Sequence, residues 1–173
     1  AKKYGVSVII RKELDKKRKG YALMEAIDEI LINNKNYEAY FIFDADNVLD
    51  KNYLKEMTKT YDEGYDIGIG YRNSKNGNEN AVAACSSLIF TIINTIGNQN
   101  KTEKSVNSTV SGTGFYIRGN WIKKWKTYPF HTLTEDYELS LYGVVNNLTT
   151  YYNTDAIYYD EQPVKYTDTI NQR

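Results

Sequence analysis

Two short apolar segments on either side of a helical pattern constrain the fold of this chain most strongly. Residues 6–10 (V-S-V-I-I) and 39–43 (A-Y-F-I-F) are rich in β-branched and aromatic residues, which indicates two strands. Apolar residues between them recur at helical spacing: Leu23, Ala26, Ile27, Ile30 and Leu31. A strand, a helix and a strand at this spacing predict a βαβ unit with two parallel strands.

The rest of the chain continues the alternation of helices and strands. Helices are predicted over residues 51–62 (capped by Asp50 and ended by Gly64), from residue 81 onward, and over 120–125 and 135–145. Strands are predicted over residues 66–71, 114–118, 148–152 and 156–159, with a polar loop over 72–80 and a flexible loop over 98–108. We expect one α/β domain over residues 1–173, a three-layer α/β/α sandwich with a mainly parallel sheet.

Composition excludes several classes of protein. The 22 basic and 22 acidic residues cancel, which argues against a protein that binds nucleic acid by bulk electrostatics. The single cysteine excludes an internal disulfide, and we expect Cys85 to be a buried thiol. The apolar run over residues 81–97 is short and interrupted by polar residues, so we expect a buried or interfacial helix there rather than a membrane span.

Two aspartates, Asp44 and Asp46, follow the predicted strand over residues 39–43. In open α/β sheets, ligands gather beyond the carboxyl ends of the strands. In extended geometry, the spacing of two lets both carboxylates point to one side, and Mg²⁺ or Mn²⁺ accepts such oxygen ligands together with substrate phosphates. The alternative is a surface turn in which Asp46 or Asn47 bonds local backbone.

Two further segments carry candidate site residues. Glu135 and Asp136 lie at a predicted helix start, where Asp136 could act as a general base. The structural alternative is a capping box between Thr132 and Glu135. The turn Ser111-Gly112-Thr113-Gly114 has glycines that permit close approach of backbone to a ligand, or that simply form a tight turn.

The stretch F-D-A-D-N-V-L-D (residues 43–50) resembles two enzyme families. It is similar to the first motif of haloacid-dehalogenase-like phosphatases, in which Asp44 would be a phosphorylated nucleophile and Asp46 an acid/base. It also resembles the D-x-D motif of nucleotide-sugar glycosyltransferases. The later segment T-E-D (residues 134–136) is not expected in the phosphatases.

An ordered set of segments resembles family 2 glycosyltransferases, in particular the bacterial membrane-associated group related to cellulose, hyaluronan and chitooligosaccharide synthases. The segments are K-G-Y-A-L (19–23), F-D-A-D-N (43–47), G-Y-R-N-S-K (70–75), S-G-T-G-F (111–115), F-H-T-L-T-E-D-Y-E (130–138), Y-D-E-Q-P (159–163) and I-N-Q-R (170–173). The resemblance implies a nucleotide-diphospho-sugar transferase (GT-A) fold that lacks its first strands here. It also implies a catalytic domain cut at both ends, whose parent protein lies at the cytoplasmic face of the membrane through segments absent from this soluble piece.

The resemblance also implies roles for individual residues. Asp46 is the chief metal ligand, and Asp44 contacts the metal or the ribose. Lys19 and Gly20 lie near the nucleotide-sugar, which is expected to be UDP-linked. Asp136 is the base of an inverting transfer to a carbohydrate acceptor. The acceptor side is formed by Ser111, Gly112, Thr113, Gly114, Glu135, Gln172 and Arg173. A non-catalytic module that binds a sugar or nucleotide is a further alternative.

Overall fold

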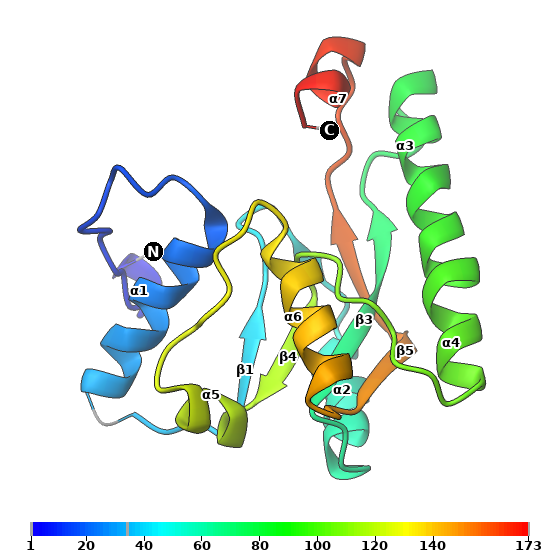
Figure 1. Ribbon diagram of the computed structural model, residues 1–173. Helices are drawn as coiled ribbons and strands as arrows, with labels where there is room; N and C mark the ends of the chain where they lie inside the picture. The colour runs from blue at the N-terminus through cyan, green and yellow to red at the C-terminus, as the bar shows by residue number, and fades with distance from the viewer. Residues whose placement is uncertain (1, 34, 173) are drawn as a thin grey trace.

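The computed structural model describes residues 2–33 and 35–172, which form a mixed α/β fold (Figure 1). The strands form one five-stranded sheet in the order β1-β4-β3-β5-β2. In this order their bounds are Ala39–Ile42, Phe115–Arg118, Ile67–Ser74, Thr150–Asp160 and Val48–Leu49. The α/β class predicted from the sequence is therefore confirmed.

The prediction of a mainly parallel sheet is wrong. Among the strands of residues 2–33 and 35–172, β3 and β5 are the one parallel pair, whereas β1–β4, β3–β4 and β2–β5 are antiparallel. The predicted βαβ unit is missing because residues 6–10 form no strand, and within the described residues β1 pairs with β4 alone. A short 3-10 helix, η1 (Lys2–Tyr4), lies near the start of the chain. The first apolar run thus has strand composition but no strand partner, which periodicity cannot reveal.

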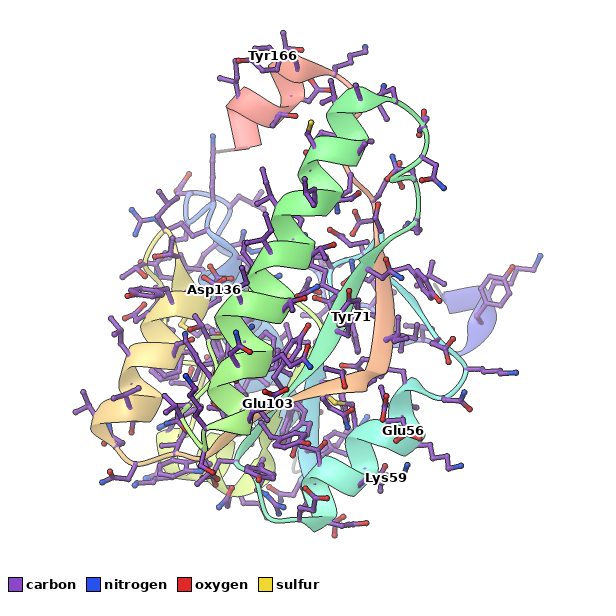
Figure 2. All side chains as sticks on the ribbon, turned by 90° about the vertical axis from the view of Figure 1, so that its right-hand side faces the viewer. Glu56, Lys59, Tyr71, Glu103, Asp136 and Tyr166 are labelled. Carbon is purple, nitrogen blue, oxygen red and sulfur yellow. The ribbon has the colours of Figure 1, made fainter. Side chains whose placement is uncertain are left out.

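Helices pack on both faces of the sheet, as Figure 2 shows from its edge. On one face, α1 (Lys19–Ile32), α5 (Gly119–Trp125) and α6 (Glu135–Val145) bury Ile27, Ile122 and Leu139 in the larger core. On the other face, α2 (Tyr53–Asp62) buries Tyr53 and Met57 against rings from β4 and β5. The regular three-layer sandwich stays a prediction.

Glycines in β3 make room for aromatic rings on the α2 face. A Cβ at Gly68 would lie 2.1 Å from the Tyr116 ring, and one at Gly70 would lie 2.7 Å from the Tyr53 ring. Both distances are far inside van der Waals contact, so only glycine fits at these two positions.

A long helix after β3 has its polar side turned inward. It runs without interruption through α3 (Ala81–Ile92), the π-helix η2 (Ile93–Gln99) and α4 (Asn100–Glu103). Ser86, Asn94 and Asn98 are buried, whereas Leu88 and Ile96 are exposed. The loop predicted over residues 98–108 is wrong in its first part, because the helix continues to Glu103 and Asn98 accepts a hydrogen bond from Thr109 N (3.0 Å). Residues 104–108 form neither helix nor strand, as predicted.

This helix also corrects one expectation about its surface. Cys85 is exposed rather than buried. Over Ala81–Glu103 the helix has 23 residues and a mean hydropathy of 1.5, so by length and composition it could cross a membrane. Among the residues that the structure describes it is the one helix that meets this test, and 22% of its apolar window is buried.

Several element boundaries differ from the prediction. The two strands expected over residues 148–152 and 156–159 form the single strand β5, and β3 continues to Ser74. The helix α2 begins at Tyr53 after Asn52, and Asp50 supports this start by accepting a hydrogen bond from Asn52 N (2.9 Å). A last helix, α7 (Tyr166–Gln172), follows β5. Each shift is a few residues, the usual error of boundaries read from sequence.

Candidate active site

The chain turns sharply where β1 ends. Asn47 N donates a hydrogen bond to Asp44 O (3.1 Å), which closes a turn over residues 44–47. The prediction that extended geometry directs both carboxylates to one side is therefore wrong. The turn gives Asp44 and Asp46 different surroundings.

Asp44 faces the start of α1 and the glycine turn before β4. Its Oδ1 forms an ion pair with Lys19 Nζ, which also donates to Gly112 O (2.7 Å). Its backbone N–H donates to Thr113 Oγ1 (2.9 Å). Lys19 thus links three segments that are far apart in the sequence: the start of α1, the end of β1 and the turn over residues 111–114.

Gly20 explains how Lys19 reaches this position. A Cβ at Gly20 would lie 2.1 Å from Phe130 O, so a side chain there would push α1 away from the segment that leads into α6. The glycine therefore permits the first turn of α1 to touch that segment. The structure supports a packing role for Gly20, and a contact with nucleotide-sugar stays a prediction.

The turn over residues 111–114 brings Asp136 beside the Lys19 contact. Gly112 has φ +77°, and a Cβ placed there would lie 3.4 Å from Asp136 Oδ2. Gly114 has φ +68°, and its Cβ would overlap the Tyr158 ring at 2.0 Å. One glycine therefore borders the candidate base, whereas the other accommodates a core ring. Ser111 is half-buried and Thr113 is buried.

The first turn of α6 supplies two acids, and Figure 2 labels Asp136 at this helix start. Glu135 is only 7% exposed, and this burial raises the pKa of its carboxyl group. The charges of Asp136 and Asp44 raise the pKa of Glu135 further, while its own backbone N–H and the Lys19 ammonium lower it. Asp136 is half-buried, and its Oδ1 accepts from Tyr137 N (2.8 Å).

The predicted capping box at α6 is absent from the structure. The N-cap residue is Thr134, whose side chain makes no capping hydrogen bond. Instead, Glu138 Oε2 accepts from His131 N and Thr132 N, both at 3.0 Å. Thr132 and Glu135 therefore do not form the predicted capping box.

Asp46 lies on the other side of the turn, in contact with solvent. Its backbone oxygen accepts a hydrogen bond from Lys75 Nζ. Its side chain borders a cavity of about 390 Å³, together with Glu161, Gln162, Pro163, Val164 and Asp168. The cavity separates the turn from α7. Gln172 ends that helix but its side chain is not described, and Arg173 lies outside the described residues.

The donor set around Asp46 fits a hard cation only if the substrate contributes. Within residues 2–33 and 35–172, no group of three or more histidine, cysteine, aspartate or glutamate side chains is placed to hold a metal ion. Mg²⁺ and Mn²⁺ are commonly bound by one or two carboxylates together with phosphate oxygens and water. Asp46 is exposed and offers such an oxygen ligand, so the residues present fit a cation shared with a diphosphate.

Sequence reasoning missed a polar network beneath the turn. Asp160, at the end of β5, is 4% exposed and pairs with Arg72 Nε (2.9 Å). Asn47 Nδ2 donates to the other oxygen of Asp160 (2.8 Å), and Thr113 donates its hydroxyl to Asn47 Oδ1. The sequence feature that could have indicated this network is an acidic residue directly after an apolar strand. Asp160 has this position, as Asp44 does.

The comparison with known families shows the family to which the chain belongs. The family model described as Glycosyl transferase family group 2 matches residues 41–173, which include the turn, Asp136 and α7. The chain belongs to this family. It is therefore a glycosyltransferase, and the family favours this activity over the phosphatase alternative. A search among curated proteins finds no match.

The matched segment places most of the candidate residues inside the glycosyltransferase domain. Lys19 and Gly20 lie before the match, whereas both aspartates of the turn and the acids of α6 lie within it. In Figure 1 the ends of β1 and β5 and the start of α6 lie on the same upper side of the sheet. The structure thus brings Lys19, Asp44, Gly112 and Asp136 together, and puts Asp46 on the neighbouring surface.

Proposed function

We propose that the glycosyltransferase transfers a sugar from a nucleotide-sugar, with UDP as the expected nucleotide, to a carbohydrate hydroxyl with inversion. The observation that carries this proposal is the contact of Lys19 with both Asp44 and the backbone of Gly112, beside Asp136. In this grouping the Lys19 ammonium would face the anionic donor, and the Asp136 carboxylate would face the acceptor hydroxyl.

The donor side consists of Lys19, Gly20 and the turn at the end of β1. Asp46, with Asp44 as its neighbour, would hold Mg²⁺ or Mn²⁺. When bound, the cation stabilises negative charge on the diphosphate that leaves. The Lys19 ammonium is half-buried and already interacts with a carboxylate and a carbonyl oxygen, so it lies where an anionic donor would need a positive charge.

The acceptor side consists of the turn over residues 111–114 and the start of α6. Asp136 Oδ1 is occupied by the Tyr137 N–H, whereas Oδ2 faces Gly112, which has no side chain. Oδ2 is therefore the oxygen that can take the proton from an acceptor hydroxyl as that hydroxyl attacks the anomeric carbon. Glu135 would lie beside the acceptor as the second acid on this side, and burial raises the pKa of its carboxyl group.

Further details of the proposal come from the family resemblance. Ser111, Gly112, Thr113, Gly114, Gln172 and Arg173 would line the acceptor path. The parent protein would belong to the group related to cellulose, hyaluronan and chitooligosaccharide synthases. It would act at the cytoplasmic face of a membrane, with residues 1–173 as part of its catalytic domain.

The proposal is tested by separating donor binding from transfer. Binding of nucleotide-sugars is screened by thermal shift and calorimetry with and without Mn²⁺. Transfer is measured from the amount of nucleoside diphosphate released. Asp136→Asn should lower turnover about 10²–10⁴-fold because general-base assistance is lost, while metal-dependent donor binding remains. Asp46→Ala should instead abolish metal-dependent binding. Normal turnover by Asp136→Asn would refute the assigned base.

A further inference from the structure

Asn47 has no role in the reaction proposed above, yet its side chain connects three segments at the site. Its Oδ1 accepts hydrogen bonds from the Thr113 hydroxyl and from Asp44 N (3.3 Å). Its Nδ2 donates to Asp160 Oδ1 (2.8 Å) and to Asp46 Oδ1 (3.3 Å). The orientation of the amide follows from its partners, because a carboxylate accepts and a backbone N–H donates.

Asp160 gives Asn47 a fixed point of attachment. The Asp160 carboxylate is buried, so it needs a compensating charge and several donors. Arg72 supplies the charge through Nε (2.9 Å), and Gln162 Nε2 adds a further donor (3.2 Å). Asn47 Nδ2 completes this set at 2.8 Å. An amide bonded to so well-held a carboxylate has little freedom to rotate.

Asp46, by contrast, is held weakly. It is exposed, and within the part of the chain that the structure describes, the Asn47 amide is the one donor to its carboxylate. The same NH₂ group therefore lies between two carboxylates, Asp46 and Asp160, and interacts favourably with both. Groups that hydrogen-bond a metal-binding carboxylate orient it and commonly change metal affinity 10- to 100-fold, as a rough range.

We propose that Asn47 is a positioning residue that aims the Asp46 carboxylate at a divalent cation shared with the donor diphosphate. This inference rests on the proposed function, because it takes Asp46 as the metal ligand. A scaffold role alone would make Asn47 matter for stability and not for the cation. The two roles differ in what the loss of the amide does to the metal dependence of donor binding.

A matched asparagine separates the two roles. Asn153 is also half-buried and also makes four hydrogen bonds, but it lies against α2: it donates to Glu56 O and Thr60 Oγ1 and accepts from Asp155 N and Ala156 N. Asn47→Ala and Asn153→Ala are compared with the unmodified chain. The readouts are the melting temperature and the Mn²⁺ concentration that gives half-maximal binding of UDP, GDP or ADP in calorimetry.

Both variants should melt at lower temperature. Asn47→Ala should raise the Mn²⁺ requirement about tenfold or more, whereas Asn153→Ala should change it less than about twofold. Equal Mn²⁺ requirements in the two variants would overturn the inference while leaving the proposed function intact. If Asn47→Ala does not fold, Asn47→Ser should show an intermediate requirement, and a normal one would overturn the inference. If the unmodified chain binds none of these nucleotides with Mn²⁺, the proposed function is wrong and the inference with it.

Discussion

Lys19 Nζ forms an ion pair with Asp44 Oδ1 across the gap between the start of α1 and the end of β1. The same ammonium donates to Gly112 O (2.7 Å), so one side chain joins the donor and acceptor sides of the proposed site. Both partners of the pair are partly exposed, with side-chain exposures of 31% and 42%. Solvent screens such a pair, so its importance should lie in positioning more than in stability.

Lys19→Met should therefore impair the reaction more than the fold. We expect turnover to fall about tenfold or more, because the proposed charge-assisted contact of Lys19 with the anionic donor, worth roughly 1.5–3 kcal/mol, is lost. The melting temperature should fall by no more than about 4 °C, since a partly exposed pair contributes about 1 kcal/mol or less. Lys16→Met, which breaks the exposed pair of Lys16 with Glu13, is the control with the same change in charge. Equal turnover in the two variants would contradict the positioning role.

Glu135 should make the stability of the protein depend on pH. Burial raises the pKa of its carboxyl group in the folded state. The folded chain then binds more protons than the unfolded chain between the two pKa values, so the free energy of unfolding falls as pH rises through that interval. The favourable contribution is fully present below the unfolded-state pKa of about 4.3 and is lost above the folded-state pKa.

Glu135→Gln tests this dependence directly. Glutamine cannot ionise, so the variant should melt above the unmodified protein near neutral pH. The difference should shrink toward zero as the pH falls to about 4, where both side chains are neutral. Glu38→Gln, at an exposed position before β1, is the control for the same substitution outside the buried site. A Glu135→Gln advantage that persists in acid would show that titration of Glu135 is not its cause.

The sequence predicted several helices and strands better than the pairing of the strands in the sheet. Apolar periodicity located α1, α6 and β4 within a few residues because local pattern determines those elements. Strand partners depend on contacts between distant segments, so the antiparallel pairing of β1 with β4 was out of reach. The turn at Asp44 was misjudged for a similar reason. Its geometry depends on Thr113 and Asp160, residues far from it in the chain.

The long helix over Ala81–Glu103 also contains a residue, Asn98, whose structure could not be predicted from local sequence. Polar residues over residues 98–108 resemble a loop, yet Asn98 bonds both backbone groups of Thr109, donating to its O (3.1 Å) and accepting from its N (3.0 Å). Asn98→Ala should cost about 2–4 kcal/mol, because it leaves two polar groups without these partners. Ile96→Ala removes a large apolar side chain that is 65% exposed and should cost about 0.5 kcal/mol or less.

Urea denaturation of the two alanine variants measures this contrast. The expected order is opposite to the usual one, in which replacing an apolar residue of a helix lowers the free energy of unfolding more than replacing a polar residue. If Ile96→Ala destabilises the protein as much as Asn98→Ala does, then the apolar side of this helix is covered in solution and the assumption of an exposed face is wrong.

Two glycines with left-handed backbone separate conformational strain from steric overlap. A Cβ at Gly64 (φ +99°) would have no atom within 4 Å, whereas a Cβ at Gly114 (φ +68°) would lie 2.0 Å from the Tyr158 ring. Gly64→Ala should therefore cost only the conformational term of about 1–2 kcal/mol. Gly114→Ala should cost roughly 3 kcal/mol or more, because overlap with a packed ring adds to that term.

A double variant shows whether the ring is the cause. In Gly114→Ala combined with Tyr158→Leu, the smaller side chain makes room for the new methyl group. The loss in the free energy of unfolding should then be smaller than the sum of the two single losses, by about 1 kcal/mol or more. Additive losses, measured by urea denaturation, would mean that the ring moves aside freely. The conformation of the turn before β4 would then depend on the backbone of Gly114 and not on packing against Tyr158. The position of this turn beside Asp136 would likewise not depend on the core.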